Sequence, residues 1–207
     1  MVVGNDTRKS FPQIAGGIKD GFNMMGCNVI DLGIVPTPTV VYMVRKLKAD
    51  GGAVATASHN PPEWNGIKFI SPRGEFINEQ EFRRFSVFLN FFDRHPKKII
   101  EYMGYFGECT EYEKSFEEHI KEIIEHFKLK NLGFKVGVDA VCGAGSLALP
   151  ALLEMAGCKV YKIHCSFKPR FPRPPEPTPE NITKLCKLVK YRKCDVGFAL
   201  DPDGVRL

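Results

Sequence analysis

Residues 56–68 bring together side chains that can take part in proton transfer and group transfer. They read Thr-Ala-Ser-His-Asn-Pro-Pro-Glu-Trp-Asn-Gly-Ile-Lys, which supplies the hydroxyl of Ser58, the imidazole of His59 and the amine of Lys68. Two prolines after Asn60 restrict the backbone and disfavour a helix there. Hydroxyls can act as nucleophiles, and imidazoles and amines can exchange protons, so the segment is a candidate reactive loop. The same residue types also form ordinary surface turns.

The residues before this loop predict a strand that brings it to the edge of a sheet. Ala53-Val54-Ala55 is a short apolar run of the kind that forms a buried strand. Ser58 follows the expected carboxyl end of that strand. Because ligands of open α/β sheets bind beyond the carboxyl ends of the strands, this position suits a functional loop.

Apolar residues at three- and four-residue spacing predict helices that alternate with short strands, which is typical of an α/β protein. Thr37 and Pro38 are an expected N-cap and first-turn proline of one such helix. Residues 79–92 form an expected helix rich in phenylalanine, and we expect those phenylalanines to lie in the core. Thr178 is expected to cap a helix over residues 180–190.

A second unit is expected to begin with a strand, a tight glycine loop and a helix. The strand covers residues 135–139, the loop contains Gly143 and Gly145, and the helix covers residues 146–155. This order of strand, loop and helix is typical of the beginning of a nucleotide-binding type of fold. The pair of glycines is weak evidence for a dinucleotide site, because Ala148 stands where the full motif has its third glycine.

Composition excludes several classes of protein. The net charge is +5, but the 29 basic residues are scattered among 24 acidic ones, so we expect no nucleic-acid surface. A mild positive excess also suits an anionic phosphosugar. No stretch reaches the roughly 18 apolar residues of a membrane span, and the amino terminus lacks an apolar signal region. We expect no membrane contact and a cytoplasmic location.

The cysteines agree with that compartment. The chain has seven, an odd number, and no pair with the C-x-x-C spacing. This pattern argues against both a disulfide framework and a zinc site. Because most of them lie in or beside apolar runs, we expect buried thiols in a reducing environment and assign them no chemistry.

The segment Gly51–Ile70 resembles the phosphoserine loop of the α-D-phosphohexomutases, the family of phosphomannomutases, phosphoglucomutases and phosphoglucosamine mutases. Further segments are similar to other loops of that family, in the family's order. They are Val2–Arg8, Asp31–Pro38, Gly143–Ser146, Pro175–Asn181 and the metal-loop-like Asp201–Leu207. Together these segments extend over nearly the whole chain.

The resemblance implies two consecutive three-layer α/β/α domains with mostly parallel mixed sheets. Domain I, with the phosphoserine loop, would cover residues 1–105, and a partial domain II, with the metal-binding loop, would cover residues 111–207. Domains III and IV of the family would be absent and the second sheet incomplete at its C-terminus. The chain is therefore expected to be a fragment that turns over poorly.

The activity implied is that of an isomerase, an intramolecular phosphotransferase. It would interconvert the 6-phosphate and 1-phosphate of a hexose, either mannose, glucose or glucosamine, through a phosphoserine enzyme and a bisphosphorylated sugar. Mg²⁺ and glucose 1,6-bisphosphate, or an equivalent hexose bisphosphate, would be required as cofactor and activator. The partner would be the phosphosugar, and which sugar it is stays open, as does the oligomeric state.

The resemblance also implies a role for individual residues. Ser58 would carry the phosphate, and Lys68 would be the general acid and base. The catalytic residues it implies are Ser58, His59, Lys68 and Arg8, of which Arg8 would contact phosphate. The substrate-binding residues it implies are Thr56, Asn60 and Arg206, of which Arg206 would help hold the phosphoserine or the substrate phosphate.

The expected metal ligands are Ser58, Asp201 and Asp203, and here the chain departs from the family pattern. Val205 stands where a third aspartate is expected. Valine offers no oxygen to Mg²⁺, which wants about six oxygen ligands. Either water fills that position at reduced affinity, or this copy is inactive.

Two other hypotheses stay open. A non-catalytic phosphosugar-binding relative with a degraded metal site would account for Val205. A nucleotide-binding module would rest only on Gly143 and Gly145. Metal affinity and phosphorylation of Ser58 separate the first from a mutase, and binding of a dinucleotide would support the second.

Overall fold

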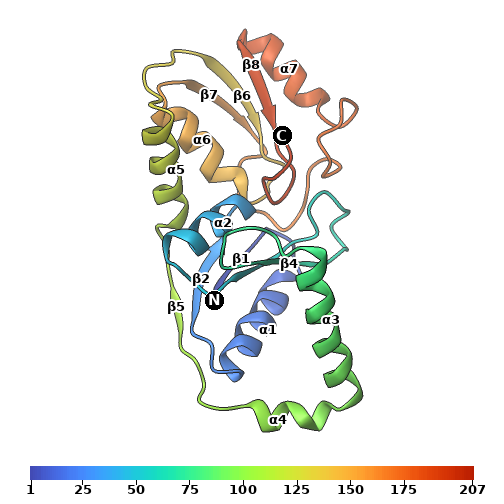
Figure 1. Cartoon of the computed structure of the whole chain (residues 1–207). Coiled ribbons are helices and arrows are strands. Elements are labelled where there is room, and N and C mark those ends of the chain that lie inside the picture. Colours follow the sequence, from blue (N-terminus) through green and yellow to red (C-terminus); the bar gives the residue numbers. More distant parts are fainter.

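The computed structural model describes residues 1–207 and places them in two units, each built on its own sheet (Figure 1). Both sheets carry helices on their faces, and parallel pairing dominates both. The predicted α/β class with mostly parallel sheets is therefore confirmed. None of the helices combines the length and the apolar character that crossing a membrane requires.

The first sheet has five strands in the order β4-β3-β1-β2-β5. The strands are β1 (Val2–Asn5), β2 (Val29–Ile34), β3 (Gly52–Ala55), β4 (Ile67–Ile70) and β5 (Cys109–Glu111). The central strand β1 pairs in parallel with β2 and β3, and only β4 runs antiparallel, against β3. Since β3 lies beside the centre of the sheet, the loop that follows it begins from a rigid position.

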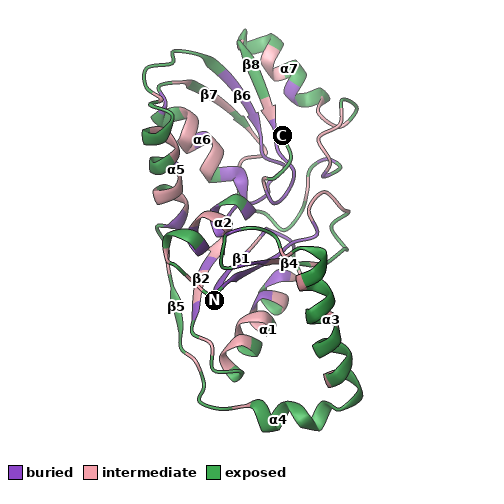
Figure 2. Ribbon diagram, in the orientation of Figure 1, coloured by how far each residue is buried: buried purple, intermediate pink, exposed green.

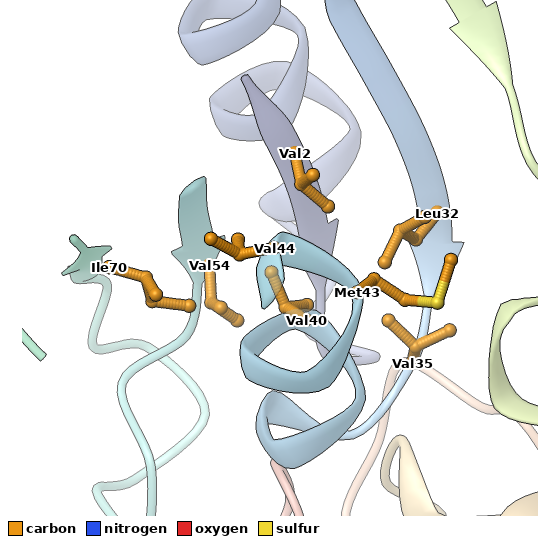
Figure 3. Packing of buried hydrophobic residues seen from close by; sticks show 8 residues of the cluster. All are labelled: Val2, Leu32, Val35, Val40, Met43, Val44, Val54 and Ile70. Carbon is orange, nitrogen blue, oxygen red and sulfur yellow. The ribbon is translucent and has the colours of Figure 1, made fainter. Parts of the chain in front are cut away.

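Helices α1 (Phe11–Met24) and α2 (Thr37–Lys46) cover opposite faces of this sheet. The alternation of β3 side chains decides this, because successive residues of a strand point to opposite faces. Ala55 packs with Phe11 of α1, whereas Val54 belongs to the core under α2. Figure 3 shows that core, whose members are Val2, Leu32, Val35, Val40, Met43, Val44, Val54 and Ile70.

Glycine allows α2 to approach the sheet closely. A Cβ atom added at Gly52 would lie 2.8 Å from Cγ2 of Val44. A side chain there would push α2 outward. Gly4 allows the same close approach nearer the amino end of α2, where an added Cβ would lie 2.6 Å from Cγ2 of Val40. The amino end of α2 is therefore held close to the strands, which matters for the site described below.

Helix α3 (Glu79–Arg94) forms as predicted, but its phenylalanines do not lie in the core. Asn78 and Glu81 cap it reciprocally, with two hydrogen bonds of 2.9 Å. No residue of α3 is buried, and Phe88 is 64% exposed (Figure 2). Phe85 packs against Phe69 of β4, with ring centroids 4.9 Å apart. Helical spacing can predict an apolar face, but only the tertiary structure decides whether another element covers it.

The first unit extends beyond the expected boundary at residue 105. After α3 the chain forms a short 3₁₀ helix, η1 (Pro96–Lys98), and a short helix, α4 (Ile99–Tyr102). It then returns as β5, which pairs with β2 of the first sheet. The boundary therefore lies after Glu111, because a strand belongs to the sheet with which it pairs.

The second unit contains a three-stranded parallel sheet in the order β7-β6-β8. Its elements are α5 (Ser115–His126), β6 (Lys135–Asp139), α6 (Gly145–Met155), β7 (Lys159–Ile163), α7 (Thr183–Arg192) and β8 (Val196–Ala199). Gly137 and Gly197 lie beneath α7, where a Cβ at Gly197 would be 2.7 Å from Val189. Helix α6 lies on the other side of the sheet (Figure 1).

The predictions that Thr37 and Thr178 cap helices are wrong. Helix α2 begins at Thr37 itself, after Pro36, and no side chain caps it. Helix α7 begins at Thr183, after Ile182, because the backbone first makes a turn in which Asn181 donates to the carbonyl of Thr178. The hydroxyl of Thr37 has a partner in the other unit instead.

The two units meet at the carboxyl ends of their central strands. In the loop after β1, the Thr7 hydroxyl donates to the carbonyl of Cys142 in the loop after β6, at 2.9 Å. Helix α5 contacts both α2 and α6 and so connects the units on one side. The loops at strand ends of both sheets consequently face each other.

Candidate functional site

Ser58 lies at this junction, just beyond the carboxyl end of β3. Its backbone has a φ of +52°, a left-handed conformation that costs a residue other than glycine about 1–3 kcal/mol. Its amide donates to the hydroxyl of Thr56 at 2.9 Å, and Thr56 in turn donates to Asp6 at 2.8 Å. Its own hydroxyl donates to Oδ2 of Asp201 at 3.0 Å. The strained turn therefore presents the serine oxygen to the second unit.

Asp201 and Asp203 follow β8 and carry two completely buried side chains. Burial, together with the neighbouring charge of Asp203, raises the pKa of Asp201. Burial also acts to raise the pKa of Asp203, but the charge and hydrogen bond of Lys68 and the hydrogen bond of Thr37 outweigh it and hold that pKa below its usual value. Two carboxylates forced together in this way form a site that favours a cation.

The two oxygens of Asp203 have different surroundings. Oδ2 accepts hydrogen bonds from Nζ of Lys68 and from the hydroxyl of Thr37, each at 2.6 Å. Oδ1 is buried and has no hydrogen-bond partner. Because buried carboxylate oxygens normally have partners, Oδ1 is an oxygen available to a ligand.

These oxygens fit a hard divalent cation. Mg²⁺ prefers oxygen ligands, and Ser58, Asp201 and Asp203 supply a hydroxyl and two carboxylates from two facing loops. Val205, in the position of the expected third aspartate, is 45% exposed. Its backbone amide donates to Oδ1 of Asp201 at 3.0 Å, so it supports the side chain of Asp201 while its own side chain supplies no oxygen.

Arg8 is almost completely buried, and its donors organise the reactive loop. Its guanidinium pairs with Asp6 at 3.2 Å and donates to the carbonyls of Ser58 at 2.7 Å and of Asn60 at 2.9 Å. It also donates to the carbonyls of Pro61 and Trp64. Burial raises the pKa of Asp6 to about 6, although Arg8 opposes this effect. The donors expected to contact a phosphate thus hold the loop backbone.

The remaining expected residues lie around Ser58 in different ways. His59 is half-buried, and its Nδ1 is buried without a hydrogen-bond partner. Asn60 takes part through its backbone, whose amide donates to the carbonyl of Ala57. Arg206 turns its side chain away toward Glu176, with a nitrogen–oxygen distance of 2.5 Å at the surface. The structure therefore brings together Ser58, Thr56, Lys68, Asp201 and Asp203, but not the guanidinium of Arg206.

Buried residues that the sequence did not single out hold the aspartate loop in place. Arg173 pairs with Asp139 at 3.1 Å and donates to the carbonyl of Leu200, the residue before Asp201, at 2.7 Å. Ala144 donates its amide to the carbonyl of Pro202 at 2.7 Å. The only indication of the Arg173 contacts in the sequence was the presence of an arginine within a proline-rich loop.

The glycine loop considered for nucleotide binding packs against the same aspartate loop. A Cβ atom at Gly143 would lie 2.5 Å from the carbonyl oxygen of Pro202. Glycine is needed here for the close approach of two backbones. This packing accounts for Gly143 without a nucleotide.

Comparison with known proteins gives the same family for both units. Residues 1–84 match the family described as "Phosphoglucomutase/phosphomannomutase, alpha/beta/alpha domain I", and residues 114–207 match domain II of the same description. The chain is 40% identical, over 211 aligned residues, to a "Phosphoglucomutase/phosphomannomutase" of Thermococcus kodakarensis. It is 33% identical to a "Phosphoglucosamine/phosphogalactosamine mutase" of Sulfurisphaera tokodaii.

The chain spans about half the length of the curated relatives it matches. All of it aligns, but it covers 45% of the Thermococcus protein and 46% of the Sulfurisphaera protein. These relatives are named as phosphomutases, which are isomerases.

A solved structure confirms the fold. A phosphoglucomutase/phosphomannomutase family protein from Burkholderia thailandensis superposes with a TM-score of 0.80 at 26% identity, over 98% of this chain and 44% of that one. With two consecutive domain matches over most of its length, this chain belongs to the phosphoglucomutase/phosphomannomutase family.

Proposed function

We propose that this chain carries the phosphoserine and metal-binding half of a phosphohexomutase. The enzyme would interconvert a hexose 6-phosphate and a hexose 1-phosphate. One observation carries the proposal: the Ser58 hydroxyl, on a strained turn of the first unit, donates to buried Asp201 of the second unit at 3.0 Å. An ordinary surface turn would not be expected to contact a buried pair of carboxylates.

The proposed chemistry uses Ser58 as the phosphate carrier. In the forward step the bond between phosphorus and Ser58 Oγ breaks and a bond from phosphorus to a sugar hydroxyl forms. Lys68 takes the proton of that hydroxyl, and Ser58 Oγ is left as an oxyanion. In the second step, after the sugar has turned over, the bond between the other phosphorus and its sugar oxygen breaks, that phosphorus forms a bond to Ser58 Oγ, and Lys68 returns the proton to the sugar oxygen. Because phosphoryl transfer has a loose transition state, the protein contributes mainly positioning and charge neutralisation.

The residues around Ser58 support that role. Asp201, Oδ1 of Asp203 and the phosphorylated Ser58 would hold Mg²⁺, which neutralises charge on the phosphoryl group. Thr56 and Arg8 fix the loop through the contacts described above. The free Nδ1 of His59 is available to a phosphate or sugar oxygen.

Arg206 and the side chain of Asn60, whose backbone groups are already hydrogen-bonded, complete the proposed substrate contacts. Arg206 would release its surface pair with Glu176, where both side chains are 45% exposed, in order to reach a phosphate. A surface pair of this kind is worth about 0–1 kcal/mol, so a phosphate can compete for the guanidinium. The substrate class is a phosphorylated hexose such as the phosphates of mannose, glucose or glucosamine.

Intact-mass spectrometry tests this proposal. The purified chain would be incubated with glucose 1,6-bisphosphate and Mg²⁺, with Ser58→Ala as the matched control. A gain of one phosphate, about 80 Da, is expected in the wild type and not in the control. An equal gain of phosphate in the folded wild type and in the folded Ser58→Ala variant would contradict the assignment of Ser58.

A second candidate is a phosphosugar-binding relative without catalysis. It is favoured by Val205, which contributes no oxygen to the aspartate loop and is 45% exposed. If the wild type gains no phosphate, the Val205→Asp variant separates the two functions. Phosphorylation rescued in that variant indicates a degraded metal site, whereas glucose 1,6-bisphosphate bound without transfer in both forms supports the binding protein.

A further inference from the structure

Thr37 of the first unit is bonded twice to Asp203 of the second. Its hydroxyl donates to Oδ2 at 2.6 Å, and its backbone amide donates to the carbonyl oxygen of Asp203 at 2.9 Å. Both residues are buried, and 166 positions of sequence separate them. The contact therefore joins the amino end of α2 to the aspartate loop without any solvent between them.

Two donors converge on one oxygen of Asp203. Lys68, from β4, donates to the same Oδ2 as Thr37, also at 2.6 Å. A carboxylate can rotate about the bond that joins it to Cβ, which exchanges its two oxygens. Two donors from different elements oppose that rotation and leave Oδ1 as the buried oxygen without a partner.

The position of Thr37 is itself rigid. It is the first residue of α2, it follows Pro36, and the first turn of α2 is packed on the sheet through Val40, which lies over Gly4. A β-branched side chain in a helix has few accessible rotamers. The hydroxyl of Thr37 therefore reaches Asp203 from a fixed position, whereas the amine of Lys68 reaches it at the end of a flexible side chain.

We propose that Thr37 is a positioning residue that orients Asp203, so that Oδ1 faces the cation held between the two units. The inference rests on the proposed function, since it concerns the same metal site. Outer partners that hydrogen-bond to a metal ligand fix its orientation, and their loss typically weakens metal binding about 10–100-fold. Thr37 would act through Asp203 and would not touch the ion.

Thr39 provides a matched control on the same helix. Like Thr37 it is about 1% exposed, and its hydroxyl also bonds to the second unit, at 3.1 Å from Nδ1 of His119 in α5. Thr39→Val thus removes a buried hydroxyl that joins the units without touching Asp203. Thr37→Val removes the hydroxyl that does, and Thr37→Ser keeps it.

The experiment is a titration of the metal-free chain with Mn²⁺ alone, followed by electron paramagnetic resonance of the unbound ion. We expect Thr37→Val to bind Mn²⁺ about 10–100-fold more weakly than the wild type. Thr37→Ser and Thr39→Val are expected to bind it as the wild type does. Thermal unfolding of each variant without metal establishes that it is folded.

Three results would overturn the inference. Wild-type affinity in folded Thr37→Val, or an equal loss in Thr39→Val, would overturn it while leaving the proposed function intact. A folded wild type that binds no Mn²⁺ would overturn the inference and the metal site together. If Thr37→Val does not fold, Thr37→Ala, which places no methyl against the carboxylate, is judged by the same criteria.

Discussion

The hydroxyl of Ser58 and the carboxylate of Asp201 lie 143 positions apart in the sequence and 3.0 Å apart in space. Each comes from a loop at the carboxyl end of a strand, in two different sheets. Loops of this kind are where open α/β sheets bind ligands. The site is therefore divided between the units, and its geometry depends on the contacts that hold them together.

Replacing Arg8 by methionine is expected to destabilise the chain by about 3–5 kcal/mol, because it leaves Asp6 as a buried charge without its partner. Arg8→Lys is not expected to restore this stability, since lysine cannot reproduce the forked donors that reach Ser58 and Asn60. Denaturant unfolding measures the difference.

The control for this prediction is Arg83→Ala, which removes an exposed pair with Glu79. It should change the unfolding free energy by about 0–1 kcal/mol. If Arg8→Met proved as mild as Arg83→Ala, the buried guanidinium would not be what holds the loop.

Gly143→Ala is expected to destabilise the second unit by about 1–3 kcal/mol, the usual cost of overpacking. Its Cβ would lie 2.5 Å from the Pro202 carbonyl, so the aspartate loop would have to move. We also expect weaker Mn²⁺ binding, measured by the same titration as above.

Gly16→Ala provides the opposite control. Gly16 lies within α1, and a Cβ there would meet nothing within 4 Å. Alanine at that position should stabilise the chain by about 0.5–1 kcal/mol, because glycine weakens a helix interior. Destabilisation by both substitutions would indicate that contact with Pro202 is not the cause.

His119 makes stability depend on pH. Burial lowers the pKa of His119 from 6.5, because the ring is stacked on Tyr42 and bonded to Thr39 in the contact between α5 and α2. Its folded-state pKa is below its unfolded value, so its contribution to stability is complete above pH 6.5. That contribution is lost as the pH falls through 6.5 toward the folded pKa.

Thermal unfolding between pH 8 and about 5 tests this prediction, in the range where histidine titrates. His119→Gln, which keeps a group able to bond with Thr39, should lose less stability on acidification than the wild type does. His126→Gln, at an exposed position of the same helix, should behave as the wild type. His119 lines a pocket together with the charged side chains of Arg45 and Lys46 of α2 and Glu122 of α5. These three charged residues are unchanged in both variants. Parallel pH curves for His119→Gln and the wild type would refute the assignment.

Val205→Asp is expected to lower stability without metal and to raise affinity for Mg²⁺. The new carboxylate would lie beside Asp201 and Asp203 and repel them, by less than about 1 kcal/mol because position 205 is half-exposed. Mg²⁺ at one hundred times its dissociation constant should then stabilise the folded chain by about 2.7 kcal/mol.

Differential scanning calorimetry with and without Mg²⁺ measures both effects. Leu207→Asp adds the same charge two residues further on, at a position that is 71% exposed. It should change neither the unfolding temperature nor the response to Mg²⁺ appreciably. An equal response in the two variants would show that charge alone, and not a third ligand at position 205, attracts the ion.

Local sequence patterns were sufficient to predict several secondary-structure elements, the fold class and the family of this protein. The apolar run before Ser58 predicted β3, and the alternation of strands and helices predicted the α/β class, because backbone propensity and side-chain periodicity act over a few residues. The motifs around Ser58 and Asp201 were sufficient to identify the family, since they occur in the family's order along the chain.

The tertiary structure alone decided what individual side chains contact. Thr37 has the sequence of a helix cap, yet its hydroxyl bonds to Asp203. Arg8 and Arg206 both looked suited to a phosphate, yet one holds the reactive loop and the other pairs with Glu176. A donor takes the best acceptor within reach, and for Thr37 and Arg8 that acceptor lies far away in the sequence.

The phenylalanines of α3 illustrate the same limit for packing. Their spacing determined a helix with apolar residues, and capping by Asn78 and Glu81 determined where it begins. Whether those rings are buried depends on which elements fold against them, and here none buries them. Local sequence determines the element and its apolar face, whereas burial is a property of two surfaces that only the complete fold brings together.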